Sequence, residues 1–282
     1  MFSAPLLSIR SDIGLDSWCT ALHKIVVTAH TGADGVLTNM PQSGRQHSSR
    51  ATKKDVECVP SGDVQARSGA KVCAYCGKAV RKPTKDHVIP RCLYPSSKAG
   101  STIQRLTVPA CEECNNSWSD DEPQFRNMLV VAGEPTRSAR ELWETTVRGS
   151  FRKRDGRKRL MDLLRQMKPV QTPEGERHMV YPGQDARVMR VVRKVVRGLC
   201  HYHGLGPPVS DGRVWADVLK YMVPPEFLKQ MDFHDRDPHV FEYGYALLQE
   251  AGIESCWLLT FLERRTFFAL VLMEERELPD RQ

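Results

Sequence analysis

The chain has 282 residues, 40% of them hydrophobic, which is enough for one large domain or two modest ones. It contains no run of about 18 apolar residues, and this excludes a membrane-spanning helix. The formal net charge of +7 favours polyanionic partners, of which nucleic acid is the obvious example.

The first 70 residues are rich in Gly, Ser, Thr and charged side chains, without a sustained hydrophobic period. We therefore predict that residues 1–70 form a disordered N-terminal region. The start of the chain has neither a basic segment nor a sustained apolar segment, so we expect no secretory signal. Paired cysteines outside a secretory context are typical of a reducing compartment, and we therefore expect a cytoplasmic protein.

Four of the nine cysteines form two C-x2-C pairs, Cys73/Cys76 and Cys111/Cys114. Each pair places two sulfurs on one tight turn, and two such turns complete a tetrahedron around Zn²⁺. Because four thiolates leave no position for water, we predict that this zinc is structural. Two unrelated pairs, or a redox C-x-x-C, are the alternatives. The remaining five cysteines are scattered, and we interpret them as buried or tolerated thiols.

The segment between the cysteine pairs contains Asp86-His87-Val88-Ile89-Pro90. Neighbouring side chains on a β-strand point to opposite faces, so Asp86 and His87 are expected to take different roles without competing for space. After Cys114, cap-type residues are followed by apolar residues at helical spacing. Pro123 interrupts this pattern, which predicts two short helices rather than one long helix.

This order of motifs resembles the HNH endonuclease superfamily, the ββα-metal nucleases. A C-x2-C turn, then Asp-His-x-Ile-Pro, then C-x2-C-Asn entering a helix is similar to the members with four zinc-binding cysteines, such as phage endonuclease VII. The resemblance covers residues 71 to about 126. It implies that His87 is the general base, and that Asp86 and Asn115, the latter at the start of the helix, hold a catalytic Mg²⁺ or Mn²⁺.

The residue types suit that chemistry. An imidazole with an ordinary pKa near 6.5 accepts a proton from water at neutral pH, as a general base must. Carboxylate and amide oxygens are hard ligands of the kind that Mg²⁺ and Mn²⁺ prefer.

Arg91 follows the Ile-Pro dipeptide and is a candidate phosphate ligand; an exposed arginine is the alternative. Many members of the superfamily carry a bracing Asn on the second strand, whereas residues 104–109 contain none, and Gln104 is a candidate substitute.

The stretch from residue 137 to residue 168 is predicted to be helical and basic. Its densest part, RGSFRKRDGRKR at 148–159, is typical of a surface that follows a phosphate backbone without reading sequence. The predicted nucleic-acid-binding residues here are Arg152, Lys153, Arg154, Arg157, Lys158 and Arg159. A solvated helical face is the alternative interpretation.

Residues 186–199 give the clearest helical pattern in the chain. Five valines and Leu199 fall on one stripe, while Arg190, Arg193, Lys194 and Arg197 are expected on the opposite face, in contact with solvent or with a second stretch of nucleic-acid backbone. The runs 239–248, 255–262 and 267–273 are β-prone and separated by turn residues, which predicts an antiparallel meander.

The sequence thus predicts an α+β protein with three parts: a disordered region over 1–70, an HNH nuclease module over 71–132, and a separate α+β C-terminal domain over 134–282. Its expected function is a metal-dependent endonuclease that hydrolyses phosphodiester bonds in nucleic acid, with DNA favoured over RNA and no membrane partner. The main alternative is a zinc-containing nucleic-acid-binding protein without catalysis. A redox or adaptor protein is a third reading.

Overall fold

The computed structural model describes residues 71–95, 105–132, 136–171, 175, 177–237, 239–250 and 252–274. The predicted disordered region, residues 1–70, lies outside the described residues, as does Gln104. No described helix is long and apolar enough to cross a membrane.

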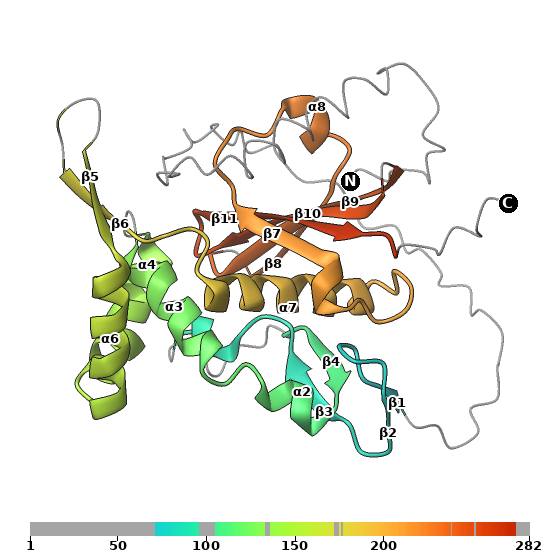
Figure 1. Ribbon diagram of the computed structural model, residues 1–282, viewed down its shortest axis with the longest axis horizontal. Helices are drawn as coiled ribbons and strands as arrows, with labels where there is room; N and C mark the ends of the chain where they lie inside the picture. Colours follow the sequence, from blue (N-terminus) through green and yellow to red (C-terminus); the bar gives the residue numbers. More distant parts are fainter. Residues whose placement is uncertain are drawn as a thin grey trace, which may run out of the picture.

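A five-stranded antiparallel sheet forms the upper layer of the molecule in Figure 1. Its strands are β7 (Val214–Val218), β8 (Asp232–Asp237), β9 (Phe241–Glu250), β10 (Ile253–Phe261) and β11 (Arg265–Leu272). The order is β7-β11-β10-β9-β8, so the last three strands form consecutive hairpins. This confirms the predicted meander. The edge strands β7 and β8 were not predicted. A short helix, α8 (Pro225–Leu228), lies on the upper side of the sheet.

Helix α7 (Ala186–Tyr202) lies beneath the sheet and packs against β7 and β11 (Figure 1). Asp185 caps its N-terminus, because a carboxylate oxygen accepts hydrogen bonds from the amides of Arg187 and Val188. All five valines of the predicted stripe and Leu199 are buried, which confirms the helix and its apolar face. A short 3-10 turn, η4 (Asp211–Arg213), connects α7 to the sheet.

The cysteine-containing segment forms a third layer below α7 (Figure 1). It consists of β1 (Lys71–Val72), β2 (Ala79–Val80), β3 (Thr84–His87), η1 (Arg91–Leu93), β4 (Thr107–Ala110) and α2 (Glu112–Asn116). Strands β3 and β4 pair in antiparallel register, with Asp86 opposite Val108 and His87 opposite Thr107. Two strands followed by a helix that packs on β3 therefore carry the Asp-His pair.

Helices on one flank connect this lower layer to the rest. They are α3 (Asp121–Val131), α4 (Arg137–Leu142), the π-helical turn η3 (Trp143–Val147), α5 (Arg148–Phe151) and α6 (Arg154–Gln166), followed by the hairpin β5 (Lys168–Gln171) and β6 (Arg177–Val180). Two short helices are present as predicted, but α2 already begins between Cys111 and Cys114, and α3 follows it. The break lies before Asp121, and Pro123 sits in the first turn of α3, where a missing N–H disrupts no helical hydrogen bond.

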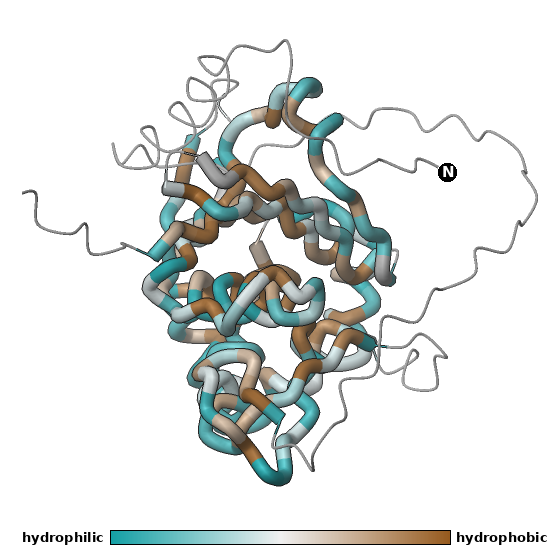
Figure 2. Tube along the Cα trace, turned by 90° about the vertical axis from the view of Figure 1, so that its right-hand side faces the viewer, coloured by the Kyte–Doolittle hydropathy of each residue, from teal (hydrophilic) through white to brown (hydrophobic). Residues whose placement is uncertain are grey.

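A continuous hydrophobic core crosses all three layers, from Cys73 to Val271. Hydrophobic segments, brown in Figure 2, accordingly occur in the upper, middle and lower parts of the molecule. Gly198 permits the approach of α7 to the lower layer, since a Cβ there would lie 3.0 Å from both γ-carbons of Val88. The α+β class is confirmed. The expected separate packing of the C-terminal part is wrong, because α7 buries one face against the sheet and another against the cysteine-containing segment.

Candidate functional site

The four predicted cysteines lie together, with all their Sγ atoms within 4.8 Å of one another. The Sγ atoms of Cys76 and Cys111 are 3.8 Å apart. A tetrahedron with Zn–S bonds of about 2.3 Å has edges of about 3.8 Å, so this cluster matches the size and chemistry of a four-thiolate zinc site. Among the described residues it is the one group of three or more Cys, His, Asp or Glu side chains whose ligand atoms lie close enough to share a metal ion.

The turn geometry prepares these thiols for a cation. Gly77 adopts φ +72°, a left-handed conformation that favours glycine, and its amide donates to the carbonyl of Cys73. Burial opposes ionisation of Cys73, but backbone hydrogen bonds, that of Cys111 first among them, lower the pKa of its thiol to about 7. The Ala74 amide donates to the carbonyl of Pro109 at 2.8 Å, which attaches the first cysteine turn to β4.

Asp86 is buried on β3, with 5% of its surface exposed. Its Oδ2 accepts a hydrogen bond from the hydroxyl of Tyr75, a residue inside the first cysteine turn. Both carboxylate oxygens also contact the Nζ of Lys194, Oδ1 at 3.2 Å and Oδ2 at 3.0 Å. The described contacts leave one acceptor position on Oδ1, because each carboxylate oxygen accepts two hydrogen bonds.

Lys194 comes from α7 and is completely buried, which contradicts its expected place on a polar face. Besides Asp86, its Nζ donates to Oε1 of Glu122 at 2.6 Å and to the carbonyl oxygen of His87 at 3.0 Å. Burial raises the pKa of Glu122, while the ammonium of Lys194 acts in the opposite direction. The two carboxylates and one ammonium give this buried group a formal net charge of −1.

Arg197, one turn further along α7, is likewise buried rather than exposed. Its guanidinium donates to the carbonyl oxygens of Val209 and Tyr75, and its Cζ lies 5.5 Å from the centre of the Tyr75 ring. Burial, and then the charge of Asp86, raises the pKa of the Tyr75 hydroxyl well above its ordinary value. Tyr75 therefore stays a hydrogen-bond donor to Asp86.

His87 lies at the end of β3 and is half-buried. Its Nδ1 is buried and has no hydrogen-bond partner among the described residues. Burial lowers the pKa of His87, and the positive charges of Arg91 and Arg105 lower it further. The imidazole is therefore neutral at pH 7, with a nitrogen free to accept a proton if Nδ1 is the unprotonated atom.

The arginines beside His87 are positioned differently. Arg91 is exposed in η1, whereas Arg105 is half-buried and its Cζ lies 4.3 Å from the centre of the Tyr94 ring. Both are close enough to influence the imidazole electrostatically. An anion such as a phosphate would be attracted to this edge of the site.

Asn115 is half-buried and lies near the end of the five-residue helix α2, not at its start as expected. The second cysteine pair occupies the beginning of α2, since the Cys111 sulfur accepts a hydrogen bond from the Cys114 amide. Helix α2 packs against β3, which brings Asn115 and Asp86 onto neighbouring elements. Their oxygens suit a divalent cation chemically, and the ammonium of Lys194 is the charge that such a cation would meet.

The predicted basic residues are displayed on the flank of the molecule. Arg152, Lys153, Arg154, Arg157 and Lys158 are exposed, and Arg159 is half-buried. None of these six forms an ion pair with another described residue. Helix α6 packs against α3, which also contacts η1, so the basic segment and Arg91 are attached to the same helix.

Four residues of the site were not predicted as such: Tyr75, Arg105, Glu122 and Lys194. No local sequence signal distinguished Lys194 from a solvent-facing residue, because its neighbours three and four positions away on the helix include Arg190 and Arg197 as well as Val191 and Gly198.

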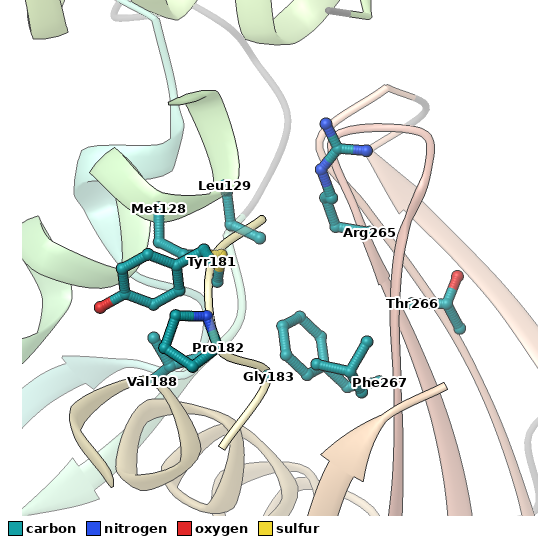
Figure 3. Close-up of a pocket in the computed structure, with 10 residues that line it drawn as sticks. Met128, Leu129, Tyr181, Pro182, Gly183, Val188, Arg265, Thr266 and Phe267 are labelled. Atoms are coloured by element: carbon teal, nitrogen blue, oxygen red, sulfur yellow. The ribbon is translucent and has the colours of Figure 1, made fainter. Parts of the chain in front are cut away.

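A separate pocket lies between α3, residues 181–183 and β11 (Figure 3). Met128, Leu129 and Tyr181 face Phe267 across it in Figure 3. It contains none of the predicted catalytic, zinc-binding or phosphate-binding residues.

Comparison of the chain with models of protein families, with curated proteins and with solved structures gives no significant match. Functional inference for this chain therefore depends on its motifs and on the geometry of the cysteine cluster and of β3.

Proposed function

We propose that this protein is a metal-dependent endonuclease of the HNH type, with His87 as general base. The observation that carries the proposal is the buried Nδ1 of His87 that lacks a hydrogen-bond partner among the described residues. A buried polar atom of this kind is costly unless a water or a ligand contacts it during function. His87 follows the predicted Asp86 on a strand pair that four clustered cysteines close onto a helix.

The proposed reaction is hydrolysis of a phosphodiester bond. The neutral imidazole of His87 takes a proton from the attacking water, and the lowered pKa keeps it in the required form at pH 7. Arg91 and Arg105 stabilise the negative charge of the phosphate as it increases in the transition state. The positive charge of Arg91 and Arg105 thus keeps His87 neutral and also stabilises the phosphate.

Asp86 and Asn115 are the residues that would hold a catalytic Mg²⁺ or Mn²⁺. Such an ion, when bound, supplies Lewis-acid stabilisation of the departing oxygen. The four cysteines hold the structural zinc, and their role is mechanical: the first turn positions Tyr75 beside Asp86, and the second pair starts the helix that carries Asn115.

The exposed basic segment supports nucleic acid as the substrate. Five exposed cationic side chains near α6, without acidic partners among the described residues, provide phosphate contacts that do not depend on base sequence. The phosphates are accessible on the backbones of both DNA and RNA, so this segment could bind either; we favour DNA because of the resemblance to HNH endonucleases.

A zinc-containing nucleic-acid-binding protein without catalysis is the second candidate. The observation that favours it is the engagement of Asp86 by Tyr75 and Lys194, which leaves this carboxylate few positions for a metal ion. The two candidates differ in one measurable property, since only the endonuclease cuts the strand to which it binds.

The test is cleavage of supercoiled plasmid and of single-stranded RNA, with Mg²⁺ or Mn²⁺, by the wild type and by His87→Ala. We expect His87→Ala to lower the cleavage rate about 10²- to 10⁴-fold, because general-base catalysis is lost. Zinc content and nucleic-acid affinity should not change. His201→Ala is the matched control, since His201 is also half-buried but lies at the end of α7.

Wild-type cleavage by His87→Ala would overturn the assignment of the base. Binding without cleavage by the wild type, with one zinc per chain, would instead establish the second candidate. Neutralising the six basic residues of the segment should weaken binding for all sequences alike and flatten its salt dependence.

A further inference from the structure

We propose that Lys194 is a positioning residue of the candidate nuclease site, and that α7 is therefore part of that site. The proposal rests on the proposed function above. Its observation is that a fully buried ammonium reaches from α7 to both members of the Asp-His pair: to the carboxylate of Asp86 and to the carbonyl oxygen of His87.

The contacts of Lys194 fix its ammonium completely. An ammonium has three N–H donors, and three acceptor groups surround it: Asp86, Glu122 and the His87 carbonyl. No donor is left to rotate toward a different partner. Because two of these acceptors belong to consecutive residues of β3, the lysine determines both the rotamer of Asp86 and the orientation of the strand end that carries the imidazole.

Stability alone does not account for such an arrangement. Removing charges from water costs several kcal/mol per ion, and replacing buried ion groups by hydrophobic residues is often neutral or stabilising. What an apolar side chain would lose is the simultaneous hold on Asp86 and on the His87 carbonyl.

The hydroxyl of Tyr75 also holds the carboxylate of Asp86. Tyr75 donates to Oδ2 of Asp86, and its own carbonyl accepts from Arg197, which lies three residues after Lys194 on α7. One helix thus holds Asp86 twice, directly through Lys194 and indirectly through Tyr75. Rotation or displacement of α7 would change both contacts together.

The test compares the wild type with the double variant E122Q/K194M. Glu122 and Lys194 are changed together because the buried group then keeps its formal charge of −1, carried by Asp86 alone. We expect kcat to fall about 10- to 100-fold, the usual effect of losing a side chain that orients a catalytic or metal-binding group. KM for DNA and zinc content should stay close to wild-type values, while Tm should fall, because the buried carboxylate of Asp86 loses its ammonium partner. Lys220→Met is the matched control, because Lys220 also pairs with a buried carboxylate, that of Asp217 on β7, and its change should leave kcat unaltered.

A second readout does not depend on activity. In ¹⁵N-histidine NMR spectra, the ring signals of His87 should shift or broaden in the double variant, while those of His201 stay in place. If the wild type does not cleave nucleic acid, the proposed function fails, and these spectra alone decide the role of Lys194.

The proposal is overturned if the double variant keeps wild-type kcat and an unchanged His87 spectrum. It is also overturned if kcat, KM and Tm all deteriorate together, because that pattern indicates a purely structural role. Should E122Q/K194M not fold, E122Q/K194Q provides the same comparison with an amide in the space of the ammonium, and the same criteria apply.

Discussion

The cysteine-containing segment, residues 71–116, and the five-stranded sheet are stabilised in different ways. The segment has strands of two to four residues, and it is held by four clustered thiols and by contacts of its buried carboxylate with charged side chains of α7. The sheet has strands of up to ten residues and a core of closely packed aromatic rings, in which the ring centroids of Tyr245 and Trp257, and those of Phe241 and Phe261, are 4.8 Å apart. We therefore expect the short segment to depend on the proposed zinc, whereas burial of apolar surface stabilises the larger sheet.

Loss of zinc should produce the largest difference in stability between the cysteine-containing segment and the sheet. We expect Cys111→Ser to abolish zinc binding and to unfold the β3–β4 hairpin, since structural zinc contributes about 10 kcal/mol or more to folding in small zinc domains. The sheet should keep its protection from hydrogen exchange. Elemental analysis and residue-resolved hydrogen exchange measure both effects. Cys200→Ala, which changes a buried thiol outside the cluster, should retain one zinc. Retention of zinc by Cys111→Ser would contradict the four-thiolate site.

A cavity in the sheet should have the opposite effect: it should destabilise the sheet and leave the cysteine cluster able to bind zinc. Trp257 is fully buried, and its indole donates to the hydroxyl of Ser255 at 3.0 Å. Trp257→Ala should lower the free energy of unfolding by about 3–5 kcal/mol, as measured by urea denaturation. Folded molecules of this variant should still contain one zinc. Trp143→Ala, at a site that is 36% exposed, should cost much less. A loss of zinc in Trp257→Ala would mean that the two regions are not stabilised independently.

The contact between the regions can be tested with one methyl group. In Gly198→Ala the new Cβ would lie 3.0 Å from the side chain of Val88 and 3.3 Å from the hydroxyl oxygen of Tyr75. We expect a destabilisation of about 1–3 kcal/mol from overpacking, measured by thermal or urea denaturation. Gly149→Ala, also in a helix but with no atom within 4 Å of the new Cβ, should be neutral or slightly stabilising. Equal effects of the two substitutions would show that α7 is not tightly packed against Val88 and Tyr75.

Much of this fold follows from local patterns. The period of the valines between 188 and 196 predicted α7, alternating apolar runs predicted β9, β10 and β11, and the spacing of the four cysteines predicted their cluster. Each of these signals lies within one element or one pair of motifs. Strands β7 and β8 gave no such signal, because Asp217 and the sequence DFHDRD of β8 are too polar to indicate a strand without knowledge of their neighbours.

The polar interior of the site was beyond local prediction. Lys194 and Arg197 resemble solvent-facing residues when α7 is considered by itself, because a single amphipathic helix is expected to have one buried face. They are buried because the cysteine-containing segment covers the face of α7 that does not pack on the sheet. The partners of Lys194 are also distant in sequence, Glu122 by 72 residues and Asp86 by 108. Asn115 and the basic segment near α6 were assigned from motif and charge, and their roles stay predictions.

The separation of 108 residues between Asp86 and Lys194 has a consequence for the order in which the molecule is made. A ribosome that adds about 5–20 residues per second reaches Lys194 roughly 5–20 seconds after Asp86. During that interval the cysteines of the nascent chain can already take up zinc, while Asp86 and Glu122 still have no ammonium beside them. If the proposed zinc binds in that interval, the nascent chain contains a zinc-loaded but unfinished centre, and the Asp-His pair acquires its final orientation only after α7, which ends at Tyr202, has been synthesised and has docked.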